Sequence, residues 1–292
     1  MSRAFAPAKI NLYLHVTGCR SDGYHLLDSL MVFANVGDRI EVRASGHLSL
    51  EISGPFSRGL SAGEDNLVLR AARCLAESAD VEPRAAIRLT KNLPVASGIG
   101  GGSADCAATL RALIQHWNLE LTNQDLHRLA LSLGADIPAC LQSRTCYLGG
   151  IGDELTPALS LPQVHLVLVN PAVSISTPDI FRARTAPFSR SARLKGVEIS
   201  SVSPEDLANT LSTRHNDLTD PAVAYAPEVA DVLSALAISN GNLLARMSGS
   251  GATCFGLYGN IETATVAAER LQKNHPNWWI KATSTLNAAN TP

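Results

Sequence analysis

A glycine-rich stretch at residues 93–105, Leu-Pro-Val-Ala-Ser-Gly-Ile-Gly-Gly-Gly-Ser-Ala-Asp, has the composition of a phosphate-binding loop. Glycine lacks a Cβ atom, so a ligand can approach the backbone closely and the chain can adopt positive φ angles. We expect a helix to follow, with Ser103 as its N-cap and Asp105 in its first turn. The free N–H groups and the positive dipole at such a helix start favour phosphate binding. The helix is predicted from apolar residues that recur at helical spacing, at Ala107, Leu110, Leu113, Ile114 and Trp117.

Two common phosphate loops do not fit these residues. A dinucleotide-binding fingerprint needs Gly or Ala where Ser103 stands, and a Walker A loop needs a lysine after Gly102. The alternative to a phosphate site is a flexible turn whose glycines only allow close packing. Because the loop, the expected cap and the amphipathic helix occur together, we favour an anion site.

Residues 9–16 alternate between apolar and polar side chains, which is the period of a β-strand with one buried face. The apolar face carries Ile10, Leu12, Leu14 and Val16. Lys9 and Asn11 lie side by side on the other face, with Tyr13 and His15. Taken alone, this face indicates a solvated edge strand.

Asp136 lies at the start of a predicted helical stretch, with Pro138 in the first turn, where a missing N–H costs nothing. An amphipathic helix precedes it and stops at Gly134. This position suits a carboxylate that caps a helix as well as one that faces a ligand. The residues alone leave capping and catalysis open.

The composition is that of a globular enzyme rather than a nucleic-acid-binding or membrane protein. The chain has 292 residues, of which 46% are hydrophobic and 17% charged, and its formal net charge is −2. Without a run of basic residues, neither a nucleic acid nor a membrane surface is expected as a partner. Lys9, Asn11 and His15 interrupt the apolar residues near the N-terminus, so we expect no secretory segment and a cytoplasmic location. The six cysteines show no paired spacing and are expected to be reduced, mostly buried thiols.

Helix and strand patterns are mixed along the chain, which predicts an α+β protein. Gly and Pro residues between 149 and 162 predict a boundary between two domains, residues 1–155 and 156–292. The segment 183–202, rich in Ser and Arg, is expected to be a mobile loop. Further strands are expected at residues 30–33, 39–43, 48–52, 86–90, 243–247, 253–258 and 278–282, and further helices at 66–78, 126–133, 204–211, 227–239 and 262–273.

Three blocks, at residues 6–14, 93–105 and 247–255, resemble in order the three motifs of the GHMP kinases, which phosphorylate small molecules such as galactose, homoserine and mevalonate. With further blocks at residues 66–70 and 170–181, the resemblance covers almost the whole chain. It implies a two-domain fold, with an N-terminal ATP-binding domain and a C-terminal α/β sandwich domain.

The resemblance also implies roles for individual residues, with ATP and Mg²⁺ as cofactors. Asp136 would be the general base at the acceptor hydroxyl, and Lys9 would orient it and offset charge on the transferred group. Ser103 would contribute to the Mg²⁺ environment, and Asn66 and Lys91 would contact adenosine. The alternatives for Asn66 and Lys91 are a helix-start residue and a strand-end lysine. The loop around the ATP phosphates would comprise Pro94, Val95, Ala96, Ser97, Gly98, Ile99, Gly100, Gly101, Gly102, Ser103 and Ala104.

Within the family, the blocks at residues 7–12, 22–25 and 134–138 are similar to those of a kinase that acts on a cytidine-diphosphate-linked polyol in non-mevalonate isoprenoid synthesis. That likeness implies an aromatic site for cytosine. The substrate-binding residues would be Asn11, Tyr24, His25 and Phe181.

Other interpretations stay open at this stage. A different acceptor, such as homoserine or mevalonate, would leave Tyr24, His25 and Phe181 without a nucleobase to hold. A nucleotide-binding protein without turnover would be expected to lack Lys9 or Asp136, and both are present. The turn at residues 248–251 is implied near the substrate phosphates. Some relatives carry a second Ser where this chain has Ala104.

Overall fold

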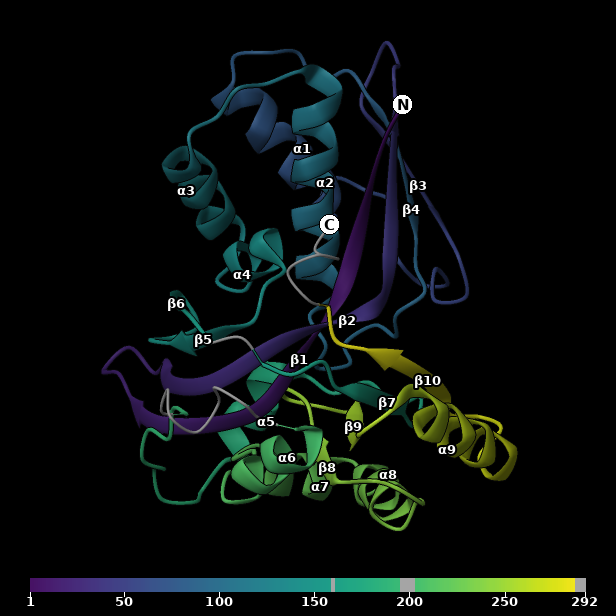
Figure 1. Ribbon diagram of the computed structural model, residues 1–292. Helices are drawn as coiled ribbons and strands as arrows, with labels where there is room; N and C mark the ends of the chain where they lie inside the picture. Colours follow the sequence, from purple (N-terminus) through teal and green to yellow (C-terminus); the bar gives the residue numbers. More distant parts are fainter. Residues whose placement is uncertain (159–160, 195–202, 287–292) are drawn as a thin grey trace.

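Within residues 1–158, 161–194 and 203–286, which the computed structural model describes, the chain folds into two β-sheets with associated helices (Figure 1). The first sheet has the strand order β3-β4-β2-β5-β6, and β1 pairs with β2. The second has the order β10-β7-β9-β8. This confirms the predicted α+β class. The strands are β1 (Ser2–Cys19), β2 (His25–Arg43), β3 (Ser49–Ser53), β4 (Ala86–Thr90), β5 (Cys146–Gly149), β6 (Glu154–Pro157), β7 (His165–Asn170), β8 (Leu244–Met247), β9 (Cys254–Tyr258) and β10 (Trp279–Ser284).

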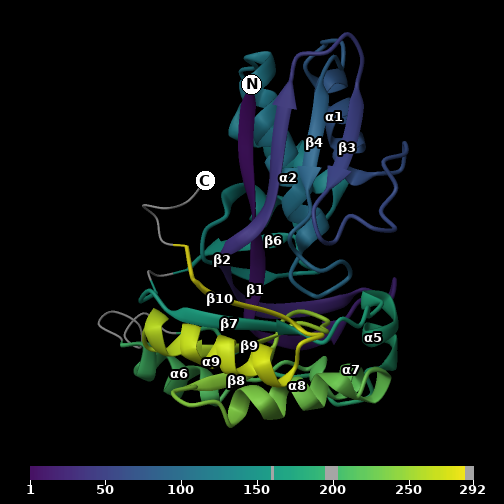
Figure 2. The ribbon, with the colours of Figure 1, turned by 90° about the vertical axis from the view of Figure 1, so that its right-hand side faces the viewer.

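Helices lie against one face of each sheet (Figures 1 and 2). The first sheet carries α1 (Leu67–Ser78), α2 (Gly101–Trp117), α3 (Asn123–Leu133) and α4 (Ile137–Gln142). The helices below the second sheet are α5 (Thr177–Ala183), α6 (Pro204–Ser212), α7 (Thr219–Tyr225), α8 (Glu228–Ala237) and α9 (Ile261–Asn274). The sequence pattern did not identify β5, β6, β7, α5 or α7.

The long strands β1 and β2 belong to both halves of the molecule. Their pairing shifts register between Pro7 and Ala8, between Asn11 and Tyr13, and between Val16 and Gly18. Such bulges bend and twist a strand, and the pair curves from the first sheet to lie along the second (Figure 2). Apolar side chains of both sheets meet there in one buried cluster, which includes Ile10, Leu12, Leu166, Leu168 and Phe255.

The strand at residues 9–16 is therefore buried on both faces and is not a half-solvated edge. Lys9, Asn11, Tyr13 and His15 are all buried although they alternate with the apolar positions. The alternation of apolar and polar residues identified the strand. Whether its polar face is covered depends on the second sheet and the helices, which the alternation does not show.

The predicted boundary between residues 155 and 156 falls inside β6, which pairs with β5 in the first sheet. The first strand of the second sheet begins at His165. The division into residues 1–155 and 156–292 stays a prediction, and a short strand of the first sheet lies across the predicted boundary.

The start of α2 differs from the expected one. The helix begins at Gly101, and its N-cap is Gly100 in the left-handed region with φ 66°. Ser103 is therefore inside the first turn rather than the cap, and Asp105 lies beyond that turn and is buried. A residue without Cβ can turn the chain into the helix at a φ that serine avoids.

In the predicted mobile segment 183–202, residue 183 ends α5, residues 184–194 are irregular, and residues 195–202 lie outside the described residues. Hydrogen bonds hold the described part: Ser189 N donates to Val16 O (2.9 Å) and Ala192 N donates to Asp28 Oδ2 (2.6 Å).

Candidate active site

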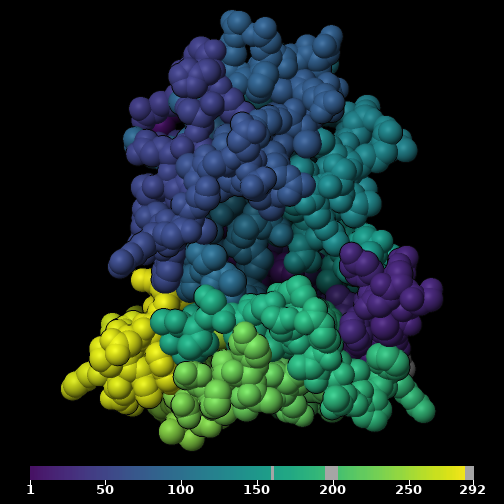
Figure 3. Space-filling model, turned by 180° about the vertical axis from the view of Figure 1, so that it is seen from behind, coloured from purple at the N-terminus to yellow at the C-terminus, as the bar shows by residue number. Residues whose placement is uncertain are grey.

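Hydrogen bonds join the three sequence blocks at residues 6–14, 93–105 and 247–255, which are far apart in the chain. Lys9 N on β1 donates to Ile99 O in the glycine loop at 3.0 Å. Ser248 Oγ, just after β8, accepts from Asn11 N at 3.1 Å and donates to Gly98 O at 3.2 Å. Figure 3 shows a hollow between the blue and teal part of the molecule and the green part, with purple atoms of the N-terminal part inside it.

Two glycines allow this interlock. A Cβ atom on Gly98 would lie 2.4 Å from Ser248 O, and one on Gly249 would lie 2.5 Å from Gly98 O. Both residues have positive φ, so a side chain would be strained as well as obstructed. A Cβ on Gly102, by contrast, would meet no atom within 4 Å. Gly98 and Gly249 thus serve packing, and Gly102 leaves an open approach to the start of α2.

Lys9 and Asp136 form an ion pair, with 2.7 Å between Nζ and Oδ2. The Lys9 side chain is 8% exposed and that of Asp136 is 35% exposed, so one carboxylate face remains open to a ligand. Burial alone would lower the pKa of Lys9, but the charge and hydrogen bond of Asp136 outweigh it and the pKa is raised. The ammonium ion is therefore retained at neutral pH.

Asp136 occupies the N-cap position of α4, but its side chain makes no capping hydrogen bond. Of the two roles that the sequence left open for this carboxylate, capping is not the one the structure gives it. The stem of Lys9 packs against the glycine loop, since a Cβ on Gly100 would lie 3.2 Å from Lys9 Cβ. The pair therefore lies next to the start of α2, where a phosphate is favoured.

Lys91 does not lie at an open nucleotide site. Its Nζ is bonded to Asp38 Oδ2 (2.5 Å) and to Asp105 Oδ2 (2.8 Å), and all three side chains are buried. Asp38 Oδ1 also accepts from the main-chain N–H groups of Asn92 and Leu93, where the loop begins. We call Lys91, Asp38 and Asp105 the loop clamp, because it joins the entrance of the glycine loop to α2.

The two carboxylate partners of Lys91 are not obvious from the sequence. Asp38 and Lys91 are 53 residues apart, and no local motif links them. Burial raises the pKa of Asp105 well above its ordinary range, and the neighbouring Asp38 adds to the rise while Lys91 opposes it.

Asn66 caps α1, as the helix-start interpretation expected. Its Oδ1 accepts from Val68 N at 2.9 Å and its Nδ2 donates to Ser61 O at 2.7 Å. In the glycine loop, Ser97 Oγ donates to Pro94 O at 2.7 Å, which leaves Val95 and Ala96 exposed at the turn between them. The loop face available to a ligand thus includes Val95, Ala96 and Gly102.

The predicted acceptor-binding residues come from β1, β2, the turn before β2 and α5. The rings of His25, at the start of β2, and Phe181, on α5, stack with centroids 5.2 Å apart and planes at 28°. Tyr24 precedes His25 in the chain and is 60% exposed. Burial lowers the pKa of His25, and the charge of Arg184 lowers it further.

Asn11 lies on β1, and its main-chain N–H is joined to the glycine loop through Ser248. Its Nδ2 donates to Ser29 Oγ at 2.8 Å, whereas its Oδ1 is buried without a partner among the described residues. An unpaired buried acceptor is costly unless a ligand supplies a donor. Asn11 thus has the free acceptor that a substrate hydroxyl would satisfy.

A two-sheet α+β fold, an interlocked glycine loop and the Lys9–Asp136 ion pair occur here in a chain that matches known family models. The model of the GHMP kinases N terminal domain matches residues 66–144, and that of the GHMP kinases C terminal domain matches residues 203–277. The chain belongs to the GHMP kinase family.

Its relatives within that family are more specific. The chain is 51% identical to 4-diphosphocytidyl-2-C-methyl-D-erythritol kinase of Paramagnetospirillum magneticum, over 97% of this chain and 98% of the relative. It is also 51% identical to the enzyme of the same name from Cereibacter sphaeroides strain KD131, over 96% and 98% of the two chains.

Solved structures agree with this placement. A crystal structure of 4-(cytidine 5'-diphospho)-2C-methyl-D-erythritol kinase is 32% identical, with a TM-score of 0.77 over 98% of this chain and 100% of the other. Homoserine kinase from Cytophaga hutchinsonii shares the fold at 18% identity, with a TM-score of 0.74 over 98% and 94% of the chains.

Proposed function

We propose that this protein transfers the γ-phosphoryl group of ATP to the 2-hydroxyl of 4-diphosphocytidyl-2-C-methyl-D-erythritol, in the non-mevalonate route to isoprenoid precursors. The observation that carries the proposal is the Lys9–Asp136 pair at 2.7 Å beside the glycine loop. Relatives at 51% identity over almost the whole chain bear the name of that kinase, which supports the choice of acceptor.

In this mechanism, Asp136 accepts the proton of the attacking hydroxyl through its exposed carboxylate face. Phosphoryl transfer has a loose transition state, so positioning and charge stabilisation matter more than a strong base. Lys9 keeps the carboxylate in place and offsets negative charge on the transferred group. Asn11, two positions along β1, accepts a hydrogen bond from the acceptor through its free Oδ1.

ATP binds along the glycine loop, with its phosphates at the start of α2. The loop residues from Pro94 to Ala104 are kept as ATP-binding residues, but Lys91 contributes through the loop clamp rather than by direct contact. Asn66 is the N-cap of α1, and it would contact adenosine from the start of that helix.

A Mg²⁺ ion fits this site only together with ATP. Among the described residues, no group of three or more His, Cys, Asp or Glu side chains could hold a metal ion. Mg²⁺ in kinases is bound mainly by substrate phosphates, water and one or two protein oxygens. Ser103 in the first turn of α2 would supply one of these, and the ion would neutralise charge on the phosphates.

The aromatic residues Tyr24, His25 and Phe181 select the acceptor by holding its cytosine. We place the reaction in the cytoplasm, with no nucleic acid or membrane as partner. All six cysteines are free, as expected in a reducing compartment, and only Cys19 is exposed. No helix among the described residues has the length and apolar character needed to cross a membrane.

The proposal is tested with a coupled assay of ADP release and a panel of alcohols. The cytidyl substrate should be turned over, whereas 2-C-methyl-D-erythritol 4-phosphate, which lacks the cytidyl group, should be a poor acceptor. Homoserine and mevalonate should not be phosphorylated. Equal use of the acceptors with and without cytidine would overturn the assignment.

A further inference from the structure

Two arms of the chain meet at the aromatic pair that the proposed function assigns to cytosine. The first arm is the end of β1 and the start of β2, residues 16–27, which carries His25. The second is α5 with the following residues 184–190, which carries Phe181. The arms touch through the stacked rings at 5.2 Å, but ring stacking alone contributes little to their relative position.

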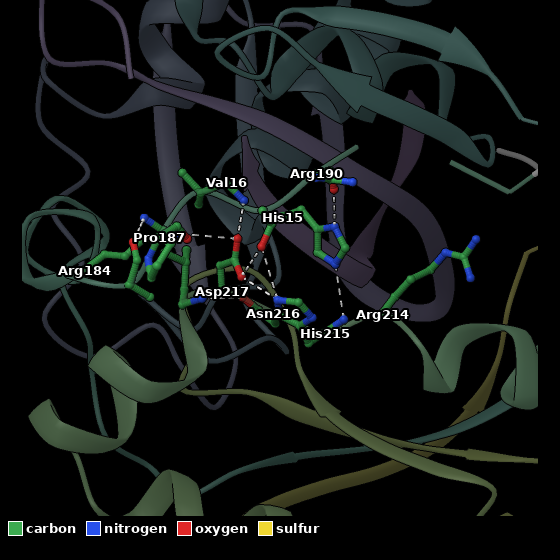
Figure 4. Close-up of polar contacts among 12 residues, drawn as sticks. His15, Val16, Arg184, Pro187, Arg190, Arg214, His215, Asn216 and Asp217 are labelled. Carbon is green, nitrogen blue, oxygen red and sulfur yellow. Dashed lines mark hydrogen bonds and ion pairs between the residues drawn. The ribbon is translucent and has the colours of Figure 1, made fainter. Parts of the chain in front are cut away.

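A single carboxylate, that of Asp217, is bonded to both arms. Its Oδ2 accepts from Val16 N on the first arm at 2.6 Å, and its Oδ1 accepts from Ser189 Oγ on the second at 2.9 Å. His215 Nε2 lies 2.7 Å from the same Oδ1. The side chain of Asp217 is 6% exposed, so these contacts are sheltered from water. Figure 4 shows the carboxylate between Val16 and the segment that contains Pro187.

The second arm is also attached by Arg184, the C-cap residue of α5. Its Nη2 lies 3.7 Å from Asp217 Oδ2, and the side chain is 3% exposed. The guanidinium group also donates to the carbonyl oxygens of Ala186 and Pro187, which folds the chain back after α5. The end of the helix that carries Phe181 is thereby tied to Asp217.

Asp217 is itself held in place by the rest of the site. Its N–H donates to Leu14 O at 2.9 Å on β1. The preceding residue, Asn216, donates through Nδ2 to Met247 O and Gly249 O, both at 2.8 Å. These carbonyls belong to the turn that interlocks with the glycine loop. Asp217 thus joins the two arms to the part of the molecule where phosphoryl transfer is proposed.

We propose that Asp217 is a positioning residue for the acceptor, which fixes the two arms so that His25 and Phe181 form one wall for the nucleobase. This rests on the proposed function. The carboxylate of Asp217 is a charged hydrogen-bond acceptor, so its bonds to the two arms are stronger than those of a neutral group. Because the carboxylate is buried, water cannot easily replace it. Asp217 need not touch the substrate to affect its binding.

The test is Asp217→Asn, which keeps the size of the side chain but removes the charge and one acceptor. We expect the Kd for CDP, measured by calorimetry, and the KM for the cytidyl acceptor to rise about tenfold. The KM for ATP should stay within about twofold, because the glycine loop is attached independently. Asp217→Glu, which restores a carboxylate, should recover part of the CDP affinity.

Two further variants keep the test decisive. Asp220→Asn makes the same charge change at an exposed position on α7 and should leave CDP binding unchanged. Ser189→Ala removes one hydroxyl from the second arm and should weaken CDP binding about threefold, even where Asp217→Asn does not fold.

The outcomes separate this proposal from the proposed function. Normal CDP affinity in both Asp217→Asn and Ser189→Ala, with wild-type protein binding CDP, overturns the positioning role alone. An equal rise in the KM values for ATP and acceptor also overturns it, since this indicates general loss of stability. Wild-type protein that does not bind CDP overturns the cytidyl assignment itself.

Discussion

Nζ of Lys9 lies 2.7 Å from Oδ2 of Asp136, although 127 residues separate them in the chain. The lysine comes from β1, a strand of the first sheet whose apolar side chains pack with those of the second, and the aspartate from the residue that precedes α4. The buried ammonium ion of Lys9 needs the negative charge of Asp136. The ion pair in turn holds the Asp136 carboxylate in place, although this side chain does not cap its helix. The remaining exposed face of Asp136 is where an acceptor hydroxyl can approach.

Asp136→Ala should lower kcat by roughly 10²–10⁴-fold, the usual contribution of a positioned acid–base group. The KM for ATP should change little, because Asp136 does not belong to the glycine loop. Steady-state kinetics with both substrates varied would measure the two effects. Lys9→Met in the Asp136→Ala background should add little further loss, because the two residues act as a unit. Near-normal turnover of Asp136→Ala would rule out the base role.

Gly102→Val should weaken ATP binding without unfolding the protein. A side chain there meets no atom within 4 Å, so it would project toward the space that a phosphate needs. We expect the Kd for ATP to rise about tenfold or more, measured by calorimetry, at an unchanged Tm.

Gly101→Val is the matched comparison. A Cβ at that position would lie 3.3 Å from Lys91 Nζ, so it would disturb the buried loop clamp. This variant should lose thermal stability. If Gly102→Val bound ATP as tightly as wild type, the phosphates would have to bind elsewhere.

Lys91→Met should destabilise the fold strongly, because it leaves Asp38 and Asp105 buried without a counter-charge. Removing one partner of a buried ion pair costs about 3–5 kcal/mol of unfolding free energy. Urea denaturation would measure the loss, with Lys281→Met, an exposed lysine on β10, as control. If Lys91→Met kept its stability but lost ATP affinity, Lys91 would instead contact the nucleotide directly.

Tyr24→Ala should raise the KM for the cytidyl acceptor roughly ten- to a hundredfold, since stacking on a base contributes about 1–3 kcal/mol. Tyr24 is 60% exposed, so little stability should be lost. The KM for ATP should not move. Tyr225→Ala, at an equally exposed tyrosine on α7, is the control and should leave both KM values unchanged. An effect of Tyr24→Ala confined to ATP would contradict the cytosine site.

Binding of the cytidyl ligand should weaken as the pH falls through the lowered pKa of His25, below about 6.5. Burial and the charge of Arg184 keep the pKa of His25 below its ordinary value of about 6.5. The native state therefore binds fewer protons than the unfolded chain, so this contribution to stability is present above the unfolded pKa and is lost as the pH falls through the folded one. The protonated ring would lie beside Arg184 with like charge.

Titration of CDP affinity between pH 8 and 5 would follow this change, with its midpoint below the ordinary histidine pKa of about 6.5. His25→Gln, which cannot ionise, should remove the pH dependence. A dependence that persists in this variant would point to another group, such as His15, whose pKa is also lowered by burial.

The sequence by itself determined the features that depend on near neighbours along the chain. Alternation gave the strand that contains Lys9 and Asn11, and β4 was predicted with its observed ends. Asn66 was expected at a helix start and caps α1, since a side-chain amide next to free N–H groups is a local arrangement. The glycine loop and the helix after it were predicted for the same reason.

Only the tertiary structure decided what these elements meet. Period two shows that a strand has two faces, but it does not show that both faces of β1 are buried. The short strand β7 is buried from Leu166 to Asn170 and has no alternation to detect, and α5 and α7 are too short for a clear helical period.

The pairing of charges was equally invisible along the chain. Lys91 follows a strand in the sequence, and folding places it between the carboxylates of Asp38 and Asp105. Because all three groups are buried, each charge needs an opposite charge beside it. Gly100 rather than Ser103 is the N-cap of α2, because the loop must turn at a positive φ against the stem of Lys9. Such contacts between distant residues depend on how the bent strands bring the two sheets together. The spacing of residues along the chain does not show that geometry.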